Sequence, residues 1–285
     1  MRAENLEEIE RRLTRIKVIY TDIDGTLVGP GGSLFTDPDG TLTLKMARAV
    51  LKALEAGIDV FMVSGRTGER LKTIARILGF RNYAAELGSE IIYDLGSKVI
   101  HNIKDIDLKK GQQPLDWIKE RGALDLIFEE FPGKIRYHTP FSETCQNSAL
   151  LIGNVEVKRA NQILTEHGLA ALRLADNGLI SPVPDFPHPH CYHLLPASAG
   201  KRSAVKKDKE IRGLRTEELV GIGESIEDIE ISSEVGIYFV VRNGAEEDAR
   251  VMRAANEQKN VFLLNYRMGL AWAEAIDILE RLGKI

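Results

Sequence analysis

The stretch that decides the fold is Lys17-Val18-Ile19-Tyr20-Thr21-Asp22-Ile23-Asp24-Gly25-Thr26-Leu27. Its first half is β-branched and aromatic, which predicts a buried strand, and its second half holds two carboxylates and a glycine turn. Residues i and i+2 of a strand point to the same face, so Asp22 and Asp24 are predicted to leave the strand end side by side. Two adjacent carboxylates repel unless a cation or a proton separates them. The pair therefore predicts a Mg²⁺ site or a nucleophile with an acid/base partner, the alternative being two exposed turn aspartates.

The flanking sequence alternates between helical and strand patterns. Apolar residues at helical spacing predict helices over 45–56 and 68–78, with a buried strand over 58–63 between them. This order predicts an α/β fold with a parallel sheet and right-handed crossovers. The alternation resumes after residue 200, with strands predicted at 219–222, 237–241 and 261–264 and helices at 225–235, 245–255 and 269–282.

The middle of the chain has a different pattern. Two short strands around Gly96 predict a hairpin over 91–100, and further strands are predicted at 149–152, 169–174 and 179–183. The last two are predicted to be joined by a turn at Asp176-Asn177-Gly178. We interpret residues 88–195 as an inserted α+β cap domain, with residues 1–87 and 196–285 forming the core.

Composition narrows the function classes. The 285 residues carry 38 basic and 42 acidic side chains, a formal net charge of −4, which gives no electrostatic reason to expect nucleic acid or an anionic membrane as partner. Two cysteines, Cys145 and Cys191, cannot build a disulfide framework and indicate a reducing compartment. No apolar run reaches the roughly 18 residues of a membrane span. We expect a cytoplasmic protein, a monomer or small homo-oligomer, that acts on a small molecule.

Two further segments lie where phosphate-binding groups are expected. Ser64 and Gly65 end the second predicted strand, where a hydroxyl and backbone N–H groups favour an anion, although a lone serine there is more often a helix N-cap. Lys201 opens a helix after Gly200 and can act as a point charge on a phosphate, although most lysines are simply exposed.

Acidic residues follow a third predicted strand. Glu224, Glu227 and Asp228 come directly after Gly223 and could complete an oxygen-rich Mg²⁺ site. The alternative is an acidic helix N-terminus that is stabilised by the helix dipole.

Taken together, these segments resemble the four ordered motifs of the haloacid dehalogenase (HAD) superfamily. They are Asp22-Ile23-Asp24-Gly25-Thr26-Leu27, Ser64-Gly65-Arg66, Lys201, and Gly223-Glu224-Ser225-Ile226-Glu227-Asp228. The insertion resembles the large α/β cap of the Cof-like and mannosyl-3-phosphoglycerate phosphatase branch, and residues 85–93 resemble its core-to-cap transition. The resemblance implies a Rossmann-like core and a phosphatase.

The resemblance also implies roles for individual residues. Asp22 would be the nucleophile and Asp24 the general acid/base, while Ser64, Gly65 and Lys201 would hold the phosphoryl group. The Mg²⁺ cofactor would be bound by Asp22, the backbone carbonyl of Asp24, Glu224 and Asp228.

The fourth motif departs from the pattern of the branch. Glu224 stands where the branch has aspartate, and Glu227 where it has asparagine. A glutamate still ligates a hard cation, but it is one methylene longer, and a misplacement of about an ångström can cost ~100-fold in rate. The departure therefore bears on metal choice and turnover rather than on the fold.

Five further residues are candidates for contacting substrate. Arg66 follows the phosphate motif, Arg136 and His138 lie in the insertion, and His190 and His193 lie at its end. The segment Pro187-His188-Pro189-His190-Cys191-Tyr192-His193 resembles a zinc site in composition, but no second cluster completes it, so we favour a hinge strand. An ordinary exposed strand is the alternative at 134–138.

The sequence thus predicts a Mg²⁺-dependent phosphomonoesterase that forms an aspartyl phosphate. Its expected substrate is a small phosphorylated metabolite, either a sugar phosphate or a glycosyl-phosphoglycerate. Two alternatives stay open: phosphoryl transfer of the phosphosugar mutase type, and a catalytically weakened protein that only binds phosphometabolites.

Overall fold

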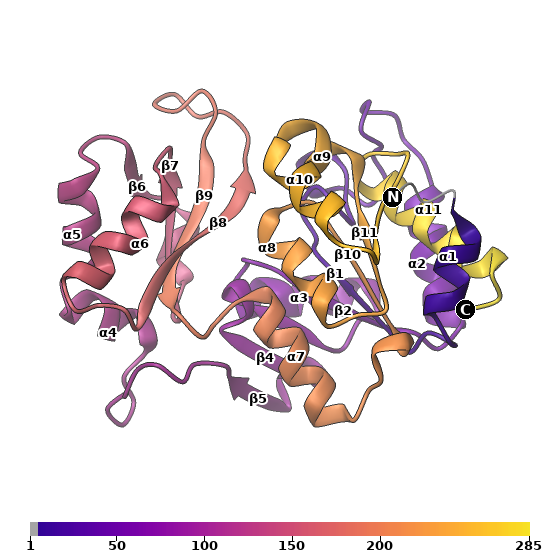
Figure 1. The fold of residues 1–285 in the computed structure, drawn as a ribbon, viewed down its shortest axis with the longest axis horizontal. Helices are drawn as coiled ribbons and strands as arrows, with labels where there is room; N and C mark the ends of the chain where they lie inside the picture. Colours follow the sequence, from indigo (N-terminus) through magenta and orange to yellow (C-terminus); the bar gives the residue numbers. More distant parts are fainter. Residues whose placement is uncertain (1–4) are drawn as a thin grey trace.

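The computed structural model describes residues 5–285. Figure 1 shows two lobes, a large one that holds both chain ends and a smaller one built from the middle of the chain. Each lobe has its own sheet, one of eight strands and one of four.

The large lobe is built on a mostly parallel sheet in the order β12-β11-β10-β1-β2-β3-β4-β5. The first six strands in this order run parallel, and β4 and β5 are added antiparallel at one edge. The strands are β1 Val18–Thr21, β2 Asp59–Val63, β3 Tyr83–Ala85, β4 Glu90–Tyr93, β5 Lys98–His101, β10 Leu219–Gly223, β11 Ile237–Val240 and β12 Val261–Leu263.

Helices cover both faces of this sheet (Figure 1). One face packs on α1 Leu6–Arg12, α2 Lys45–Glu55, α3 Gly68–Leu78 and α11 Met268–Arg281. The other packs on α7 Lys201–Arg212, α8 Ile226–Ile229 and α10 Ala249–Glu257, while α9 Arg242–Glu247 precedes α10. The central strands are buried on both faces, so they read as continuous apolar runs. The predicted α/β class with a parallel core is confirmed.

The small lobe is a four-stranded antiparallel sheet in the order β6-β7-β9-β8, with three helices on one face. Its elements are α4 Pro114–Glu120, α5 Ala123–Glu130, β6 Ile135–Tyr137, β7 Ala149–Gly153, α6 Val157–Glu166, β8 Leu172–Leu179 and β9 His190–Pro196. We call this lobe the cap. The hairpin β4–β5 lies inside the predicted insertion 88–195, yet its strands pair with the core sheet.

Three local predictions were wrong in detail. The turn at 176–178 is absent, because β8 runs through it; Gly178 at φ +99° and a slip in pairing between Asp176 and Leu179 take up the irregularity. The helix over 225–235 ends at Ile229 and continues only as a 3₁₀ turn. The helix over 245–255 is broken at Asp248, whose carboxylate accepts the amide of Arg250 and starts α10.

The site residues lie at the carboxyl ends of the parallel strands, where open α/β sheets bind ligands. The loops after β1, β2 and β10 carry the first, second and fourth motifs, and α7 begins with Lys201. Within residues 5–285 no helix combines the length and apolarity that crossing a membrane would require.

Candidate active site

Asp22 lies directly after β1 and is the most enclosed acid of the first motif. Its amide donates to the carbonyl of Ile222 on the neighbouring strand (3.1 Å), which extends the ladder by one residue. The residue is 8% exposed, and its carboxylate lies 3.2 Å from the Lys201 Nζ. Burial raises the pKa of Asp22 to about 7; Lys201 opposes this shift, while Asp228 and Asp24 add to it.

Lys201 is fully buried and bridges two acids. Its Nζ also donates to Asp228 Oδ1 at 2.7 Å, and Asp228 is fully buried as well. Burial alone would lower the pKa of Lys201, but Asp22 and Asp228 raise it above its ordinary value, so the side chain stays charged. The predicted alternative of a surface lysine is therefore wrong.

The loop after β10 holds Asp228 rigidly. Asp228 Oδ2 accepts hydrogen bonds from the Ser225 hydroxyl (2.7 Å) and the Ser225 amide (3.0 Å), and Ser225 in turn caps α8. This carboxylate is thus fully engaged by Lys201 and by its own loop.

Glu224 is aimed at the first motif. A Cβ atom on Gly25 would collide with the Glu224 carboxylate, and the backbone of Gly25 has φ +70°, a conformation that favours glycine. Asn243 donates to Glu224 Oε2 and to the Gly25 carbonyl (3.0 Å), and its own Oδ1 accepts the amide of Met268. Burial raises the pKa of Glu224 well above its ordinary value, and Asp22 and Asp228 raise it further.

Asp24 takes a different direction from Asp22. Its side chain is 55% exposed and forms a bidentate pair with Arg66, at 2.7 Å from Nε and 2.5 Å from Nη2. Strand β1 ends at Thr21, so Asp22 continues the ladder by one hydrogen bond and Asp24 lies in the turn that follows.

Ser64 and Gly65 follow β2 beneath the cap. Ser64 is 3% exposed, and its Oγ accepts the amide of Arg66 at 3.3 Å. Gly65 faces two cap side chains, because a Cβ there would lie 2.7 Å from both Asn177 Nδ2 and His193 Nε2. The second motif is therefore in contact with the cap.

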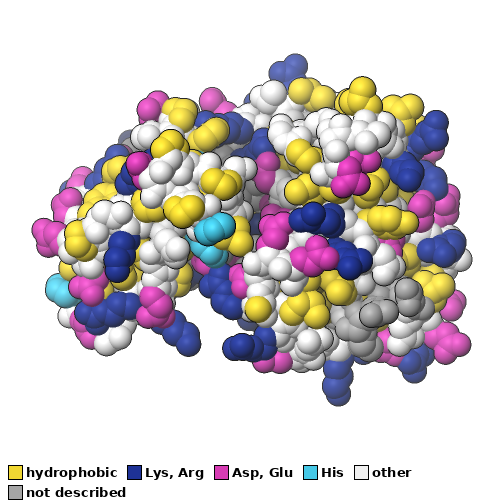
Figure 2. Space-filling model, turned by 90° about the horizontal axis from the view of Figure 1, so that it is seen from above, with side chains coloured by type: hydrophobic (Ala, Val, Ile, Leu, Met, Phe, Trp, Pro, Cys, Tyr) yellow, Lys and Arg dark blue, Asp and Glu magenta, His cyan; other side chains and the backbone are white. Residues whose placement is uncertain are grey.

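Glu227 lies at the contact surface between core and cap, which we call the seam. It does not belong to the acidic cluster formed by Asp22, Glu224 and Asp228. Both of its oxygens accept from Arg173 on β8, at 2.7 and 3.0 Å, and Arg173 also donates to the Ala199 carbonyl. The asparagine-to-glutamate departure thus coincides with an arginine on the facing cap strand. Figure 2 shows the two lobes meeting along this seam.

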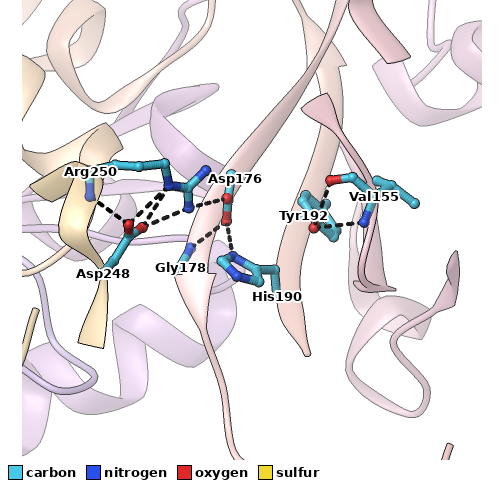
Figure 3. Close-up of polar contacts among 7 residues, drawn as sticks. All are labelled: Val155, Asp176, Gly178, His190, Tyr192, Asp248 and Arg250. Carbon is cyan, nitrogen blue, oxygen red and sulfur yellow. Dashed lines mark hydrogen bonds and ion pairs between the residues drawn. The ribbon is translucent and has the colours of Figure 1, made fainter. Parts of the chain in front are cut away.

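A second, more exposed network crosses the seam (Figure 3). Arg250 of α10 reaches Asp176 Oδ2 on β8 (2.8 Å) while it also pairs with Asp248. Asp176 Oδ1 accepts from Gly178 (3.0 Å) and lies 2.8 Å from His190 Nδ1. A cavity of about 240 Å³ lies beside this network.

The remaining predicted substrate residues lie in the cap. His193 is buried at the seam, whereas Arg136 pairs with Asp185 (3.3 Å) and is half-exposed. The ring of His138 packs 4.9 Å from that of Phe141. His190 begins β9, so the predicted strand is confirmed, while its role as a hinge stays a prediction. Across residues 5–285, no group of three or more His, Cys, Asp or Glu side chains is gathered closely enough to hold a metal ion.

The acidic cluster nevertheless has the charge of a cation site. Among the described residues, the three carboxylates of Asp22, Asp228 and Glu224 are gathered around one ammonium group, that of Lys201, which leaves a deficit of positive charge. Burial is the main cause of the raised pKa values of Asp22 and Glu224, and the neighbouring carboxylates raise them further. A hard divalent cation is the species that carboxylates in such a cluster bind best.

Sequence analysis missed several residues that shape the site. Arg173 is a lone cation in an apolar strand pattern, and Glu86 is the one acid in the buried stretch 83–89; both were signals of a buried ion pair or hydrogen bond. Nothing local in the sequence marks Ser148, Asn177 or Asn243.

The chain is similar to several known proteins. The model of the haloacid dehalogenase-like hydrolase family matches residues 19–167. A phosphoglycolate phosphatase of Sulfolobus acidocaldarius is 27% identical over 234 residues, which is 81% of this chain and 86% of that protein. The 5-amino-6-(5-phospho-D-ribitylamino)uracil phosphatase YwtE of Bacillus subtilis is 22% identical over 267 residues, covering 81% and 90%.

The fold is also shared with a solved structure. The sucrose-phosphatase of Synechocystis, determined with sucrose and phosphate, superposes with a TM-score of 0.64 over 95% of this chain and 99% of that one, at 15% identity.

Proposed function

Because this chain belongs to the haloacid dehalogenase-like hydrolase family, we propose that it is a phosphatase that hydrolyses small phosphomonoesters through an aspartyl phosphate on Asp22. The two relatives described above are phosphatases, and the class of reaction follows from them. The intermediate, the metal and the substrate are our proposals.

The observation that carries the mechanism is the buried contact between Asp22 and Lys201 at 3.2 Å. A carboxylate oxygen of Asp22 attacks phosphorus, and the bond from phosphorus to the leaving oxygen breaks. Lys201 holds positive charge next to the attacked group, where negative charge is gathered in the transition state. Ser64 and the amides of its loop are placed to bind the remaining phosphoryl oxygens.

Asp24 supports the second half of the proposed reaction. Its carboxyl group gives a proton to the leaving oxygen, and the resulting carboxylate then takes a proton from water. That water attacks the phosphorus of the aspartyl phosphate, which releases phosphate and restores Asp22. Asp24 is now paired with Arg66, so before the reaction the bidentate pair must open and Asp24 must take up a proton from solvent, which its 55% exposure permits. The proton taken from the attacking water restores this carboxyl group at the end of the cycle.

The charge deficit of the cluster supports Mg²⁺ as cofactor. Asp22 and Glu224 would hold it with the backbone carbonyl of Asp24, while Asp228 would act through Lys201 and the loop. Bound there, Mg²⁺ would supply positive charge to the transferring phosphoryl group and lower the pKa of Asp22.

The experiment is steady-state phosphate release from a panel of sugar phosphates, polyol phosphates and phosphoglycolate, with and without Mg²⁺. We expect Mg²⁺-dependent turnover that Asp22→Asn abolishes. An isomerised sugar phosphate without free phosphate would instead indicate a mutase. Tight phosphosugar binding by calorimetry without turnover under Mg²⁺, Mn²⁺ or Co²⁺ would indicate a binding protein.

A further inference from the structure

A buried hydrogen-bond relay runs from the core into the cap. Glu86 of the core accepts hydrogen bonds from three cap amides, those of Gln146 (2.9 Å), Asn147 (3.0 Å) and Ser148 (2.9 Å). The Ser148 hydroxyl donates to Glu86 Oε2 at 2.9 Å, and its oxygen lies 3.0 Å from His193 Nδ1. Ser148 and His193 are fully buried, and Glu86 is 2% exposed.

The relay determines which ring nitrogen of His193 carries the proton. Burial raises the pKa of Glu86, but the five hydrogen bonds that its carboxylate accepts, from three backbone amides, the Asn147 side chain and the Ser148 hydroxyl, favour the ionised form. An ionised Glu86 can only accept, so the single hydroxyl proton of Ser148 is used on it. Ser148 Oγ must then accept from His193 Nδ1–H. In a neutral imidazole this leaves Nε2 as a bare acceptor.

This acceptor has no partner in residues 5–285. His193 Nε2 is buried without a hydrogen bond, and so is Asn177 Oδ1 beside it. Both side chains face Gly65, next to the proposed phosphate-binding Ser64. Buried acceptors that lack donors are rare, and at a reaction site they indicate that a ligand supplies the donor.

We propose that His193 Nε2 accepts a hydrogen bond from a hydroxyl group of the leaving alcohol, so that the enzyme selects hydroxylated phosphomonoesters, such as sugar and polyol phosphates, over phosphorylated acids that lack a hydroxyl. The inference rests on the proposed function of the site. The leaving group enters between Gly65 and the cap, which requires the seam to open. The carboxylate of phosphoglycolate in that position would have no proton to donate, and its oxygen lone pairs would be repelled by the lone pair of His193 Nε2.

Glu86 and Ser148 are positioning residues in this scheme. They do not touch the substrate but hold the imidazole in the tautomer that accepts. Loss of the Ser148 hydroxyl would free the Nδ1 proton to move to Nε2, which turns the acceptor into a donor.

The kinetic test compares glycerol 3-phosphate with n-propyl phosphate, which has the same chain without hydroxyls, and with phosphoglycolate. We expect the wild type to favour glycerol 3-phosphate by at least about tenfold in kcat/KM over both. His193→Phe should remove most of that preference, measured within the variant as the ratio of kcat/KM for glycerol 3-phosphate to kcat/KM for n-propyl phosphate. Ser148→Ala should reduce the preference, and Ser148→Thr, which keeps the hydroxyl, should retain it.

A spectroscopic test on the wild type needs no variant to be active. The ¹⁵N shifts of the histidine rings, with His193 assigned from the signal lost in His193→Gln, should show a protonated Nδ1 and a bare Nε2. In Ser148→Ala the two shifts should move toward one another.

Three results would overturn the inference. They are a protonated His193 Nε2 in the wild type, equal kcat/KM values of the wild type for the three esters, or a His193→Phe variant in which kcat/KM falls by the same factor for all three esters. Failure of the proposed function is a separate result, since it would show as unchanged turnover of n-propyl phosphate in Asp22→Asn. If Asp22→Asn is inactive on every ester and the wild type still shows no preference, only the His193 inference fails.

Discussion

The acidic cluster of the core and the ion network of the seam use similar residues in opposite surroundings. In the cluster, Lys201 and Asp228 are fully buried, and each acid depends on the same ammonium group. In the seam network, Arg250 is 51% exposed and has two carboxylate partners. Water can replace a lost partner in the second case but not in the first. The comparison teaches that the core charges cannot be removed singly, whereas water can take the place of the half-exposed Arg250 in the second network.

The largest effect is expected when the attacking oxygen is removed. Asp22→Asn should lower kcat by at least about 1,000-fold, because an amide does not attack phosphorus and nothing else in the cluster replaces it. Phosphate release measures this, with the unfolding temperature as the control for folding. A variant that retains a tenth of the wild-type rate would contradict the role of Asp22.

The next largest effect is on stability. Lys201→Met should lower the free energy of unfolding by about 3–5 kcal/mol, because Asp22 and Asp228 would be left buried without a cation. Denaturant unfolding measures this. The double variant Lys201→Met with Asp228→Asn should recover part of the loss; additive losses would show that the two side chains do not interact.

Acid should lower the free energy of unfolding through His193, which is buried at the seam. Burial lowers the pKa of His193 to about 3, whereas the unfolded side chain titrates near 6.5. Below pH 6.5 the imidazole of residue 193 therefore binds a proton in the unfolded chain but not in the folded one. The free energy of unfolding thus falls as the pH falls toward 3. Between pH 6.5 and 5 this contribution is about 1.5 kcal/mol. The difference between the wild type and His193→Gln in urea at each pH isolates it; parallel curves would contradict the shift.

Replacement of Glu224 separates metal binding from packing. Glu224→Ala should weaken Mg²⁺ binding at least about tenfold by calorimetry, because it removes one of the oxygens that we propose as ligands of the ion. Glu224→Asp, the acid found in the related branch, should keep or raise the affinity. Unchanged binding in the alanine variant would show that another group holds the ion.

The smallest effect is expected in the more exposed network, at Arg250. Arg250→Ala should change the free energy of unfolding by less than about 1 kcal/mol, since the arginine is half-exposed and Asp176 keeps its contacts with Gly178 and His190. A loss as large as that of Lys201→Met would erase the distinction between the cluster and the seam.

Much of the core was predictable because its signals are local. The apolar runs and helical faces around Asp22 and Ser64 place both residues at strand ends, and parallel pairing then brings these ends to one edge. The cap was less predictable. The slip of β8 at Asp176 depends on how it pairs with β9, and the strand pattern alone suggested a turn.

The individual contacts of the acids were the least predictable part. Sequence analysis placed Glu227 near the metal because it follows β10, whereas the structure pairs it with Arg173, which lies 54 residues earlier in the chain. No local pattern encodes a contact at that separation. The same holds for Asn243 and Glu224, which come together only when α9 packs behind the first motif.

The sequence by itself determined the α/β class, the family and the chemical types at each strand end, because these depend on side-chain periodicity and on motifs read along one chain. Only the tertiary structure decided how the acids divide their work. It turned Asp22 inward to Lys201 and Asp24 outward to Arg66, and it gave Glu227 to the cap. The physical reason is burial: the charge that a carboxylate can keep, and the partner that it must have, depend on how much water the fold leaves around it.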